Sequence, residues 1–329
     1  MTDTALGLRS RLDEPPLDEP VMRAMFDQVC NWGRWGADDE MGALNFITPE
    51  TRRAAARLVE TGQSISLSHD FPTIPHRDNP YPAHHHMTIA GDDSCCIGVP
   101  GIEIARDYIG IHFHGMASSH IDALCHIFAD GKMYNGVPAS EVKSTGARRN
   151  SIHSAHQGII GRGVLLDMPR AFGVDYIDPA DLIGIPELEA AERAGSVTVG
   201  RGDILLIRMG REVMERDEEV AAGRASGAPL NLASLHPSVV PWLHEREIAV
   251  LGSDGVHDAT FQQVSNAVWP VPIHTLGIVA IGLHLLDNLA LGPVAALAAE
   301  HGRWAFHLCI APLRVVGGTG SPVNPIATF

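Results

Sequence analysis

Residues 112–126 read HFHGMASSHIDALCH and contain four histidines and one aspartate. If residues 119–123 are extended, His120 and Asp122 point to the same face, because side chains alternate in direction along a strand. A His-x-Asp pair is costly to bury unless a cation or strong hydrogen bonds satisfy it. Imidazole nitrogens and carboxylate oxygens are ligands of Zn²⁺, Mn²⁺ and Fe²⁺. The segment therefore predicts a metal site.

The composition is ordinary for a globular enzyme and unlike that of a disordered chain. The chain has 329 residues, of which 45% are hydrophobic and 19% are charged. Its formal net charge is −15 and it has no Lys/Arg-rich run, which argues against nucleic acid or an anionic membrane as a partner. No apolar run reaches the about 18 residues that a membrane span needs, so none is expected.

The cysteines and the first residues indicate a reducing compartment. There are five cysteines, two of them adjacent (Cys95 and Cys96), and no Cys-x-x-Cys occurs. A disulfide framework is therefore not expected. The first ten residues, MTDTALGLRS, lack the apolar core of a signal peptide, and we expect a cytoplasmic protein.

The pattern along the chain predicts a single α/β domain with long loops. We expect an extended N-terminal arm over residues 1–30 and one domain over residues 31–329. Thr48 is the expected N-cap of a helix that runs to about Glu60. Apolar runs predict buried strands at 164–167 and 204–208. We also expect a long loop over 71–101, strands at 63–67, 108–114, 248–252 and 304–316, and helices at 186–194, 236–247 and 273–283.

The same histidine segment suggests how a reaction could proceed. His120 and Asp122 are the expected metal ligands, with a third ligand from upstream. A divalent ion lowers the pKa of a coordinated water toward ~7. His126 is then free to act as general acid or base, since an imidazole pKa of ~6.5 suits proton transfer near neutral pH. These roles together indicate metal-assisted hydrolysis.

The segment resembles the signature of the cyclase family, metal-dependent hydrolases that include bacterial kynurenine formamidase and isatin hydrolase. Their motif is His-x-Gly-Thr-His-x-Asp-x-Pro-x-His. Its second His, its Asp and its last His match His120, Asp122 and His126, whereas Met116 stands at the first metal-binding His. A thioether is a poor ligand for a hard divalent ion. His114, two residues earlier, is the candidate for the missing ligand, as in the longer members of about 300 residues.

Further segments resemble those longer members, namely residues 38–45, 131–136, 201–208 and 272–289. The resemblance implies the swivelling β/β/α fold, a homodimer or homotetramer, one or two Zn²⁺ or Mn²⁺ ions, and hydrolysis of an amide, cyclic amide or lactone of a small, cyclic or aromatic substrate. It also implies a C-terminal helix from which His274 and Asp287 serve a second metal or the substrate. Two further candidates for that role are His86, in the long loop, and His257, after a predicted strand end.

Two other classes remain open. One is an iron-dependent oxygenase with His114, His120 and Asp122 as a two-His-one-carboxylate site. The other is a non-catalytic homologue that binds a small molecule, a reading that Met116 favours. A serine hydrolase, a nucleotide-dependent enzyme and a zincin protease are not expected, because the sequence lacks Gly-x-Ser-x-Gly, the glycine-rich phosphate loops and His-Glu-x-x-His.

Overall fold

Buried apolar runs form the centre of a nine-stranded mixed sheet. The computed structural model describes residues 8–10, 17–93, 101–217, 220, 231–258 and 268–329. Four parallel strands form the middle of the sheet, in the order β13 (His284–Asp287), β12 (Val250–Ser253), β10 (Ile204–Arg208) and β8 (Ile159–Asp167). Antiparallel strands extend both edges: β5 (His120–Asp122) and β15 (Gly320–Pro322) beyond β13, and β14 (Ala305–Ile310), β16 (Ile326–Thr328) and β2 (Ser64–Ser66) beyond β8.

The two faces of this sheet contact two separate cores. On β10, Leu205 and Ile207 pack into one core, whereas Ile204 and Leu206 pack into the other. This division follows from the two-residue repeat of a strand. Burial on both faces explains why the central strands are continuous apolar runs. The α/β class is confirmed.

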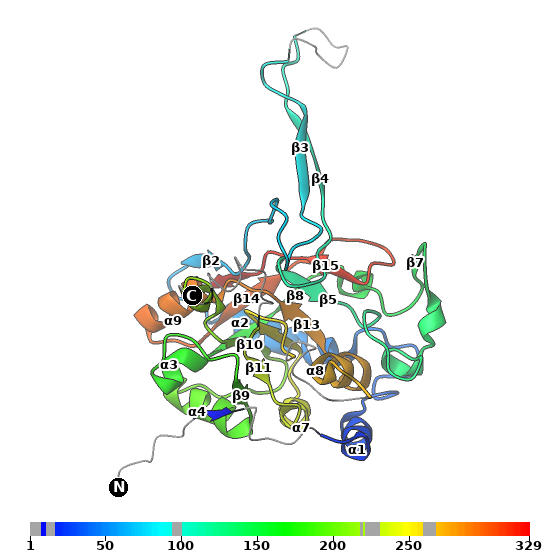
Figure 1. The fold of residues 1–329 in the computed structure, drawn as a ribbon, viewed down its shortest axis with the longest axis vertical. Helices are drawn as coiled ribbons and strands as arrows, with labels where there is room; N and C mark the ends of the chain where they lie inside the picture. The colour runs from blue at the N-terminus through cyan, green and yellow to red at the C-terminus, as the bar shows by residue number, and fades with distance from the viewer. Residues whose placement is uncertain (1–7, 11–16, 94–100, 218–219, 221–230, 259–267) are drawn as a thin grey trace.

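Helices cover the sheet (Figure 1). Thr48 caps α2 with its side chain, as predicted, but the helix ends at Ala56. The α-helices are α1 (Glu19–Val29), α2 (Pro49–Ala56), α3 (Met168–Phe172), α4 (Ile185–Gly195), α5 (Arg211–Met214), α7 (Val239–Glu245), α8 (Pro272–His274) and α9 (Leu291–His301). A π-helix, η6 (Thr275–Ile281), continues α8, and short 3₁₀ turns are η2 (Gly42–Phe46), η3 (Tyr134–Gly136), η4 (Ala139–Glu141) and η5 (Ile152–Ala155). None of the described helices combines the length and apolar composition that crossing a membrane requires.

Part of the expected N-terminal arm is a helix. Residues 1–7 and 11–16 lie outside the described residues. Arg9–Ser10 (β1) is extended and pairs with β9 (Asp181–Ile183), which also pairs with β11 (Ser234–Leu235). Glu19–Val29 is helical instead of extended, because Asp18 caps α1 and the helix buries Met22, Met25 and Val29 in the core.

The expected long loop over 71–101 contains a strand. His84–Ile89 (β3) pairs antiparallel with Arg106–Gly110 (β4), and the register joins His86 to Tyr108. We call residues 84–110 the arm, because β3 and β4 project from the body of the molecule (Figure 1). Residues 94–100 of the arm lie outside the described residues. A further small hairpin joins β6 (Val142–Lys143) to β7 (Gly146–Ala147).

The expected C-terminal helix ends before Asp287. Gly282 adopts a left-handed backbone, with φ of +76°, and closes η6. The chain then enters β13, which pairs with β12 on one side and β5 on the other. Asp287 is therefore a strand residue, because the sheet pairing outweighs any tendency to continue the helix.

A buried histidine on β13 should make stability pH-dependent. His284 is fully buried and neither ring nitrogen has a hydrogen-bond partner among the described residues. Burial lowers the pKa of His284 to about 4. The unfolded chain, with a pKa of ~6.5, binds the proton more readily, so the free energy of unfolding falls as the pH drops from 6.5 toward 4.

We expect His284→Leu to remove most of this pH dependence. Between pH 7 and pH 5 the free energy of unfolding of the wild type should fall by about 2 kcal/mol because of His284. The variant should not show this decrease. Urea unfolding at the two pH values measures the difference. His301→Leu, at the end of α9, is the matched control and should keep the wild-type dependence. Equal pH dependence in wild type and His284→Leu would contradict the assignment.

Candidate metal centre

The pairing of β5 with β13 places two carboxylates and one imidazole on one face of the sheet. Asp287 lies opposite His120 in the register, and Asp122 follows two residues after His120. All three side chains are buried. His120 is held by a 2.8 Å contact between Nδ1 and the carbonyl oxygen of Ser118. Its Nε2 is thereby turned toward the carboxylates, 3.5 Å from Oδ1 of Asp122 and 4.0 Å from Oδ2 of Asp287.

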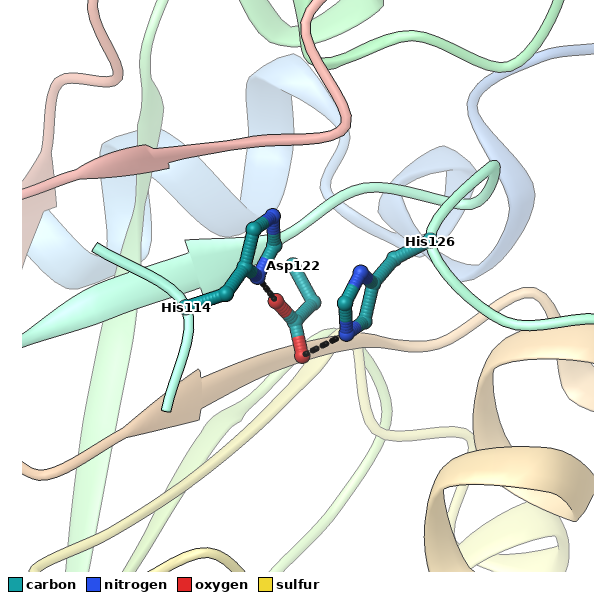
Figure 2. Close-up of side chains that lie close together, drawn as sticks. All are labelled: His114, Asp122 and His126. Atoms are coloured by element: carbon teal, nitrogen blue, oxygen red, sulfur yellow. Dashed lines mark ion pairs between the residues drawn. The ribbon is translucent and has the colours of Figure 1, made fainter. Parts of the chain in front are cut away.

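His114 and His126 approach Asp122 from the loops on either side of β5. Nδ1 of His114 lies 2.9 Å from Oδ1 of Asp122, and Nε2 of His126 lies 3.8 Å from Oδ2 (Figure 2). The two rings stack with centroids 4.0 Å apart. Nε2 of His114 contacts the hydroxyl of Thr319 at 3.0 Å. His112 and His114 do not share a strand face as expected, because β4 ends at Gly110.

His274 reaches both carboxylates from α8. Its Nε2 lies 3.5 Å from Oδ2 of Asp122 and 3.4 Å from Oδ2 of Asp287. Its Nδ1 lies 2.7 Å from Asp258, which also accepts the backbone N–H groups of Ile273 and His274. A carboxylate behind a histidine in this way fixes the ring and turns its other nitrogen toward Asp122 and Asp287.

His257 lies behind Asp287 instead of facing the open side of the cluster. Its Nε2 is 3.2 Å from Oδ1 of Asp287, and the side chain is buried. Its backbone has a φ of +57°, in the left-handed region that non-glycine residues uncommonly adopt. His86, the other candidate, is not brought to the cluster: it is exposed on the arm, where its ring contacts Tyr108.

The charges of this cluster keep the carboxylates ionised. Burial would raise the pKa of Asp122, but four imidazoles outweigh it and hold the pKa well below its usual range. The pKa of Asp287 is lowered likewise, against burial, by His257 and His274. Burial would lower the pKa of His274, but its contacts with Asp122, Asp258 and Asp287 raise it well above the ordinary value. Burial lowers the pKa of His126 to about 4, so this imidazole is neutral at pH 7.

Several buried polar atoms of the cluster make close ionic contacts but no well-aligned hydrogen bond among the described residues. They are both carboxylate oxygens of Asp122, Nδ1 of His114 and Oδ1 of Asp287. Leaving such atoms poorly satisfied is expensive, and a cation beside Asp122 would satisfy its carboxylate oxygens and Nδ1 of His114. Two groups of donor atoms lie within 4.8 Å of one another and share Asp122: His114, Asp122 and His126, and His120, Asp122 and Asp287. Imidazole and carboxylate donors in this arrangement fit one or two divalent ions.

Three supporting residues were given no role of their own by the sequence: Asp258, Arg211 and Asn288. Arg211 donates to the carbonyl oxygen of Met116 and to Asn288. Asn288 in turn donates to the carbonyl oxygens of Gly115 and Ser118, so the two side chains clamp the loop between His114 and His120. Asn288 directly follows Asp287, and Asp258 directly follows His257, so both lie beside residues that the sequence analysis named.

Met116 has a packing role. Its side chain is partly buried against the small cluster of Met214 and Leu232. The position at which the family motif has its first histidine is therefore apolar here, and His114 is the imidazole beside Asp122. Cys125 is buried in the core, and burial raises the pKa of its thiol to about 12, which argues against a thiolate nucleophile.

A cavity of about 380 Å³ opens beside His114. Residues 77–81 and 112–118 line it. This volume is typical of sites for small molecules.

The sequence and the fold were compared with known proteins. The family model described as "Putative cyclase" matches residues 63–257, more than half of the chain. The chain belongs to the cyclase family. The solved structure of a protein described as a novel cyclase is 33% identical in sequence to this chain. The match covers 92% of this chain and 99% of the other, with a TM-score of 0.82.

Isatin hydrolases share the fold of this cyclase at lower identity. Isatin hydrolase A from Labrenzia aggregata, bound to benzyl benzoate, is 20% identical over 80% of this chain and 93% of its own, with a TM-score of 0.54. An isatin hydrolase bound to the product analogue thioisatinate is 17% identical over 85% of this chain and 98% of its own, with a TM-score of 0.56. No curated protein matches the sequence significantly.

Proposed function

We propose that this cyclase is a metal-dependent hydrolase that cleaves an amide, cyclic amide or lactone bond of a small cyclic or aromatic molecule. The observation that carries the proposal is the buried carboxylate of Asp122, whose two oxygens face four imidazoles without a well-aligned hydrogen bond. The isatin hydrolases, which share the fold, support the substrate class. Zn²⁺ and Mn²⁺ are the proposed ions, since both accept imidazole and carboxylate ligands.

Each part of the site has a role in this proposal. His114, His120 and Asp122 would hold one ion, and Asp287 and His274 would complete that site or hold a second ion. A bound divalent ion would lower the pKa of a water molecule and polarise the carbonyl of the substrate. His126 is neutral at pH 7, so its Nε2 can accept a proton from the attacking water and return it to the leaving nitrogen or oxygen. The cavity beside His114 would receive the substrate.

The test is a hydrolysis assay on metal-free and reconstituted protein. Protein stripped by a chelator is incubated with Zn²⁺ or Mn²⁺ and given an N-formyl aniline, an isatin-like imide and an aromatic lactone. We expect acid release from at least one substrate class, and only after metal is restored. Binding of metal without acid release from any of them would contradict the proposal. Oxygen consumption with Fe²⁺ would instead favour an iron-dependent oxygenase. Binding of a small molecule without turnover would favour a non-catalytic binding protein.

A further inference from the structure

The loop that carries His114 is not held by backbone pairing. Residues 112–118 lie between β4 and β5, and none of them makes a backbone–backbone hydrogen bond with any described residue. Gly115, which directly follows His114, has a φ of +125°, in the region that favours glycine. Sheet pairing therefore places His120 on β5 but does not place His114. Side chains from other segments must hold this loop.

Three backbone carbonyl oxygens of the loop accept hydrogen bonds from Arg211 and Asn288, which we call the clamp. Arg211 donates to Met116 at 2.7 Å, and Nδ2 of Asn288 donates to Gly115 at 2.7 Å and to Ser118 at 3.2 Å. A further hydrogen bond of 2.6 Å runs from Arg211 to Oδ1 of Asn288. The clamp thus fixes the backbone from position 115 to position 118.

Both residues of the clamp are themselves held in place. Arg211 is the first residue of α5, and its backbone N–H donates to the buried carboxylate of Asp254, which directly follows β12. Its guanidinium pairs with Glu215 at 2.8 Å, and its side chain is only 12% exposed. The backbone carbonyl of Asn288 accepts a 2.6 Å hydrogen bond from Ser119. The clamp therefore ties the loop to the ends of β12 and β13.

His114 is the candidate ligand that depends most on the clamp. Its Nδ1 lies 2.9 Å from Oδ1 of Asp122 (Figure 2). Its side chain is 29% exposed, whereas that of His120 is 2% exposed. Apart from Asp122, its ring nitrogens contact the hydroxyl of Thr319, at 3.0 Å. Little packing surrounds the ring, so the position of the loop backbone decides whether it lies beside the carboxylate.

We propose that Arg211 and Asn288 are positioning residues that set the metal affinity of this centre by holding His114 beside Asp122. The proposal rests on the metal centre of the proposed function, but it concerns two residues outside both donor groups. Without the clamp the imidazole would leave Asp122, and the remaining ligands would hold the ion alone. Residues that orient metal ligands in this way contribute about 10- to 100-fold to metal affinity.

The test is the affinity for Zn²⁺, measured by competition with chelators of graded strength on the wild type and on Arg211→Met. Methionine is of similar length but has no donor, so we expect the dissociation constant for Zn²⁺ to rise about 10- to 100-fold. Charge alone predicts the opposite sign, because removal of a nearby cation favours a bound metal ion. A weaker site in the variant therefore separates the clamp from simple electrostatics.

Two further variants control for charge and folding. Arg208→Met is the matched control, because Arg208 is also 12% exposed but donates to Asp167 and Glu212 instead of the loop. It should keep the wild-type affinity. Arg211→Lys keeps the charge but lacks the planar fork, so its affinity should fall between those of the wild type and Arg211→Met. It takes the place of Arg211→Met if circular dichroism shows that variant to be unfolded.

A double-variant cycle with His114→Ala shows whether the clamp acts through His114. In the His114→Ala background, Arg211→Met should change the dissociation constant by less than about twofold, because the imidazole that the clamp positions is already absent. A further loss of about 10- to 100-fold in that background would overturn the proposal.

The remaining outcomes distinguish this proposal from the proposed function. Wild-type or tighter zinc affinity in folded Arg211→Met would overturn the role of the clamp and leave the hydrolase proposal intact. An equal loss of affinity in Arg208→Met would also overturn it, since the effect would then not be specific to the loop. A wild type that binds neither Zn²⁺ nor Mn²⁺ would instead remove the metal centre, and with it both proposals.

Discussion

Asp122→Asn is expected to lose its metal and to lower hydrolytic turnover by at least about a thousandfold. Asp122 is the one residue that both donor groups share, and its two oxygens face different imidazoles. Asparagine keeps the shape of the side chain but removes the charge and replaces one oxygen by a donor. A thousandfold loss corresponds to about 4 kcal/mol, within what a catalytic metal contributes to a transition state.

Elemental mass spectrometry after dialysis, together with the substrate assay, measures both effects. Asp203→Asn is the matched control, because Asp203 is also a buried carboxylate but pairs with Arg162 away from the cluster. It should keep full metal content. Stoichiometric metal in Asp122→Asn would show that the carboxylate is not a ligand and would remove the basis of the proposed function.

His126→Ala should lower turnover by about 10²- to 10⁴-fold while the protein keeps its metal. This range is what a general acid or base contributes. Burial lowers the pKa of His126 to about 4, so the neutral form that accepts a proton persists well below pH 7. If His126 is the base, wild-type turnover on the acid side should therefore fall only as the pH approaches about 4, provided that the metal stays bound.

The metal content of the His126→Ala variant distinguishes a general base from a metal ligand. His126 lies 3.8 Å from Asp122 and shares a donor group with it, so a ligand role predicts that metal and turnover fall together in His126→Ala. Retained metal with low turnover supports the base. Full turnover with bound metal would show that His126 performs neither task. His301→Ala, a histidine at the end of α9, serves as the control.

The local part of the site was predictable from spacing. His120 and Asp122 share a face because a strand repeats every two residues, and β5 covers both. The buried strands β8 and β10 and the capped start of α2 were predictable for the same reason, since each depends on neighbours in the sequence. The arm was not predictable from the sequence, because nothing in the long, proline-rich stretch before residue 101 indicated that β3 pairs with β4.

The distant part of the site depended on tertiary structure. The resemblance pointed to His274 and Asp287 but placed them on one helix, whereas Asp287 lies on β13, opposite His120. The roles of His257 and Asp258 behind Asp287 and His274 also appear only in three dimensions.

The sequence by itself determined which side chains form the centre of the site: imidazoles and a carboxylate, spaced to share one face, that a cation or strong hydrogen bonds must satisfy when buried. Only the tertiary structure decided which further groups join them. A strand or helix repeat acts over a few residues, whereas the pairing of β5 with β13 joins segments about 160 residues apart. That pairing brings Asp287 to His120, and the packing of α8 adds His274.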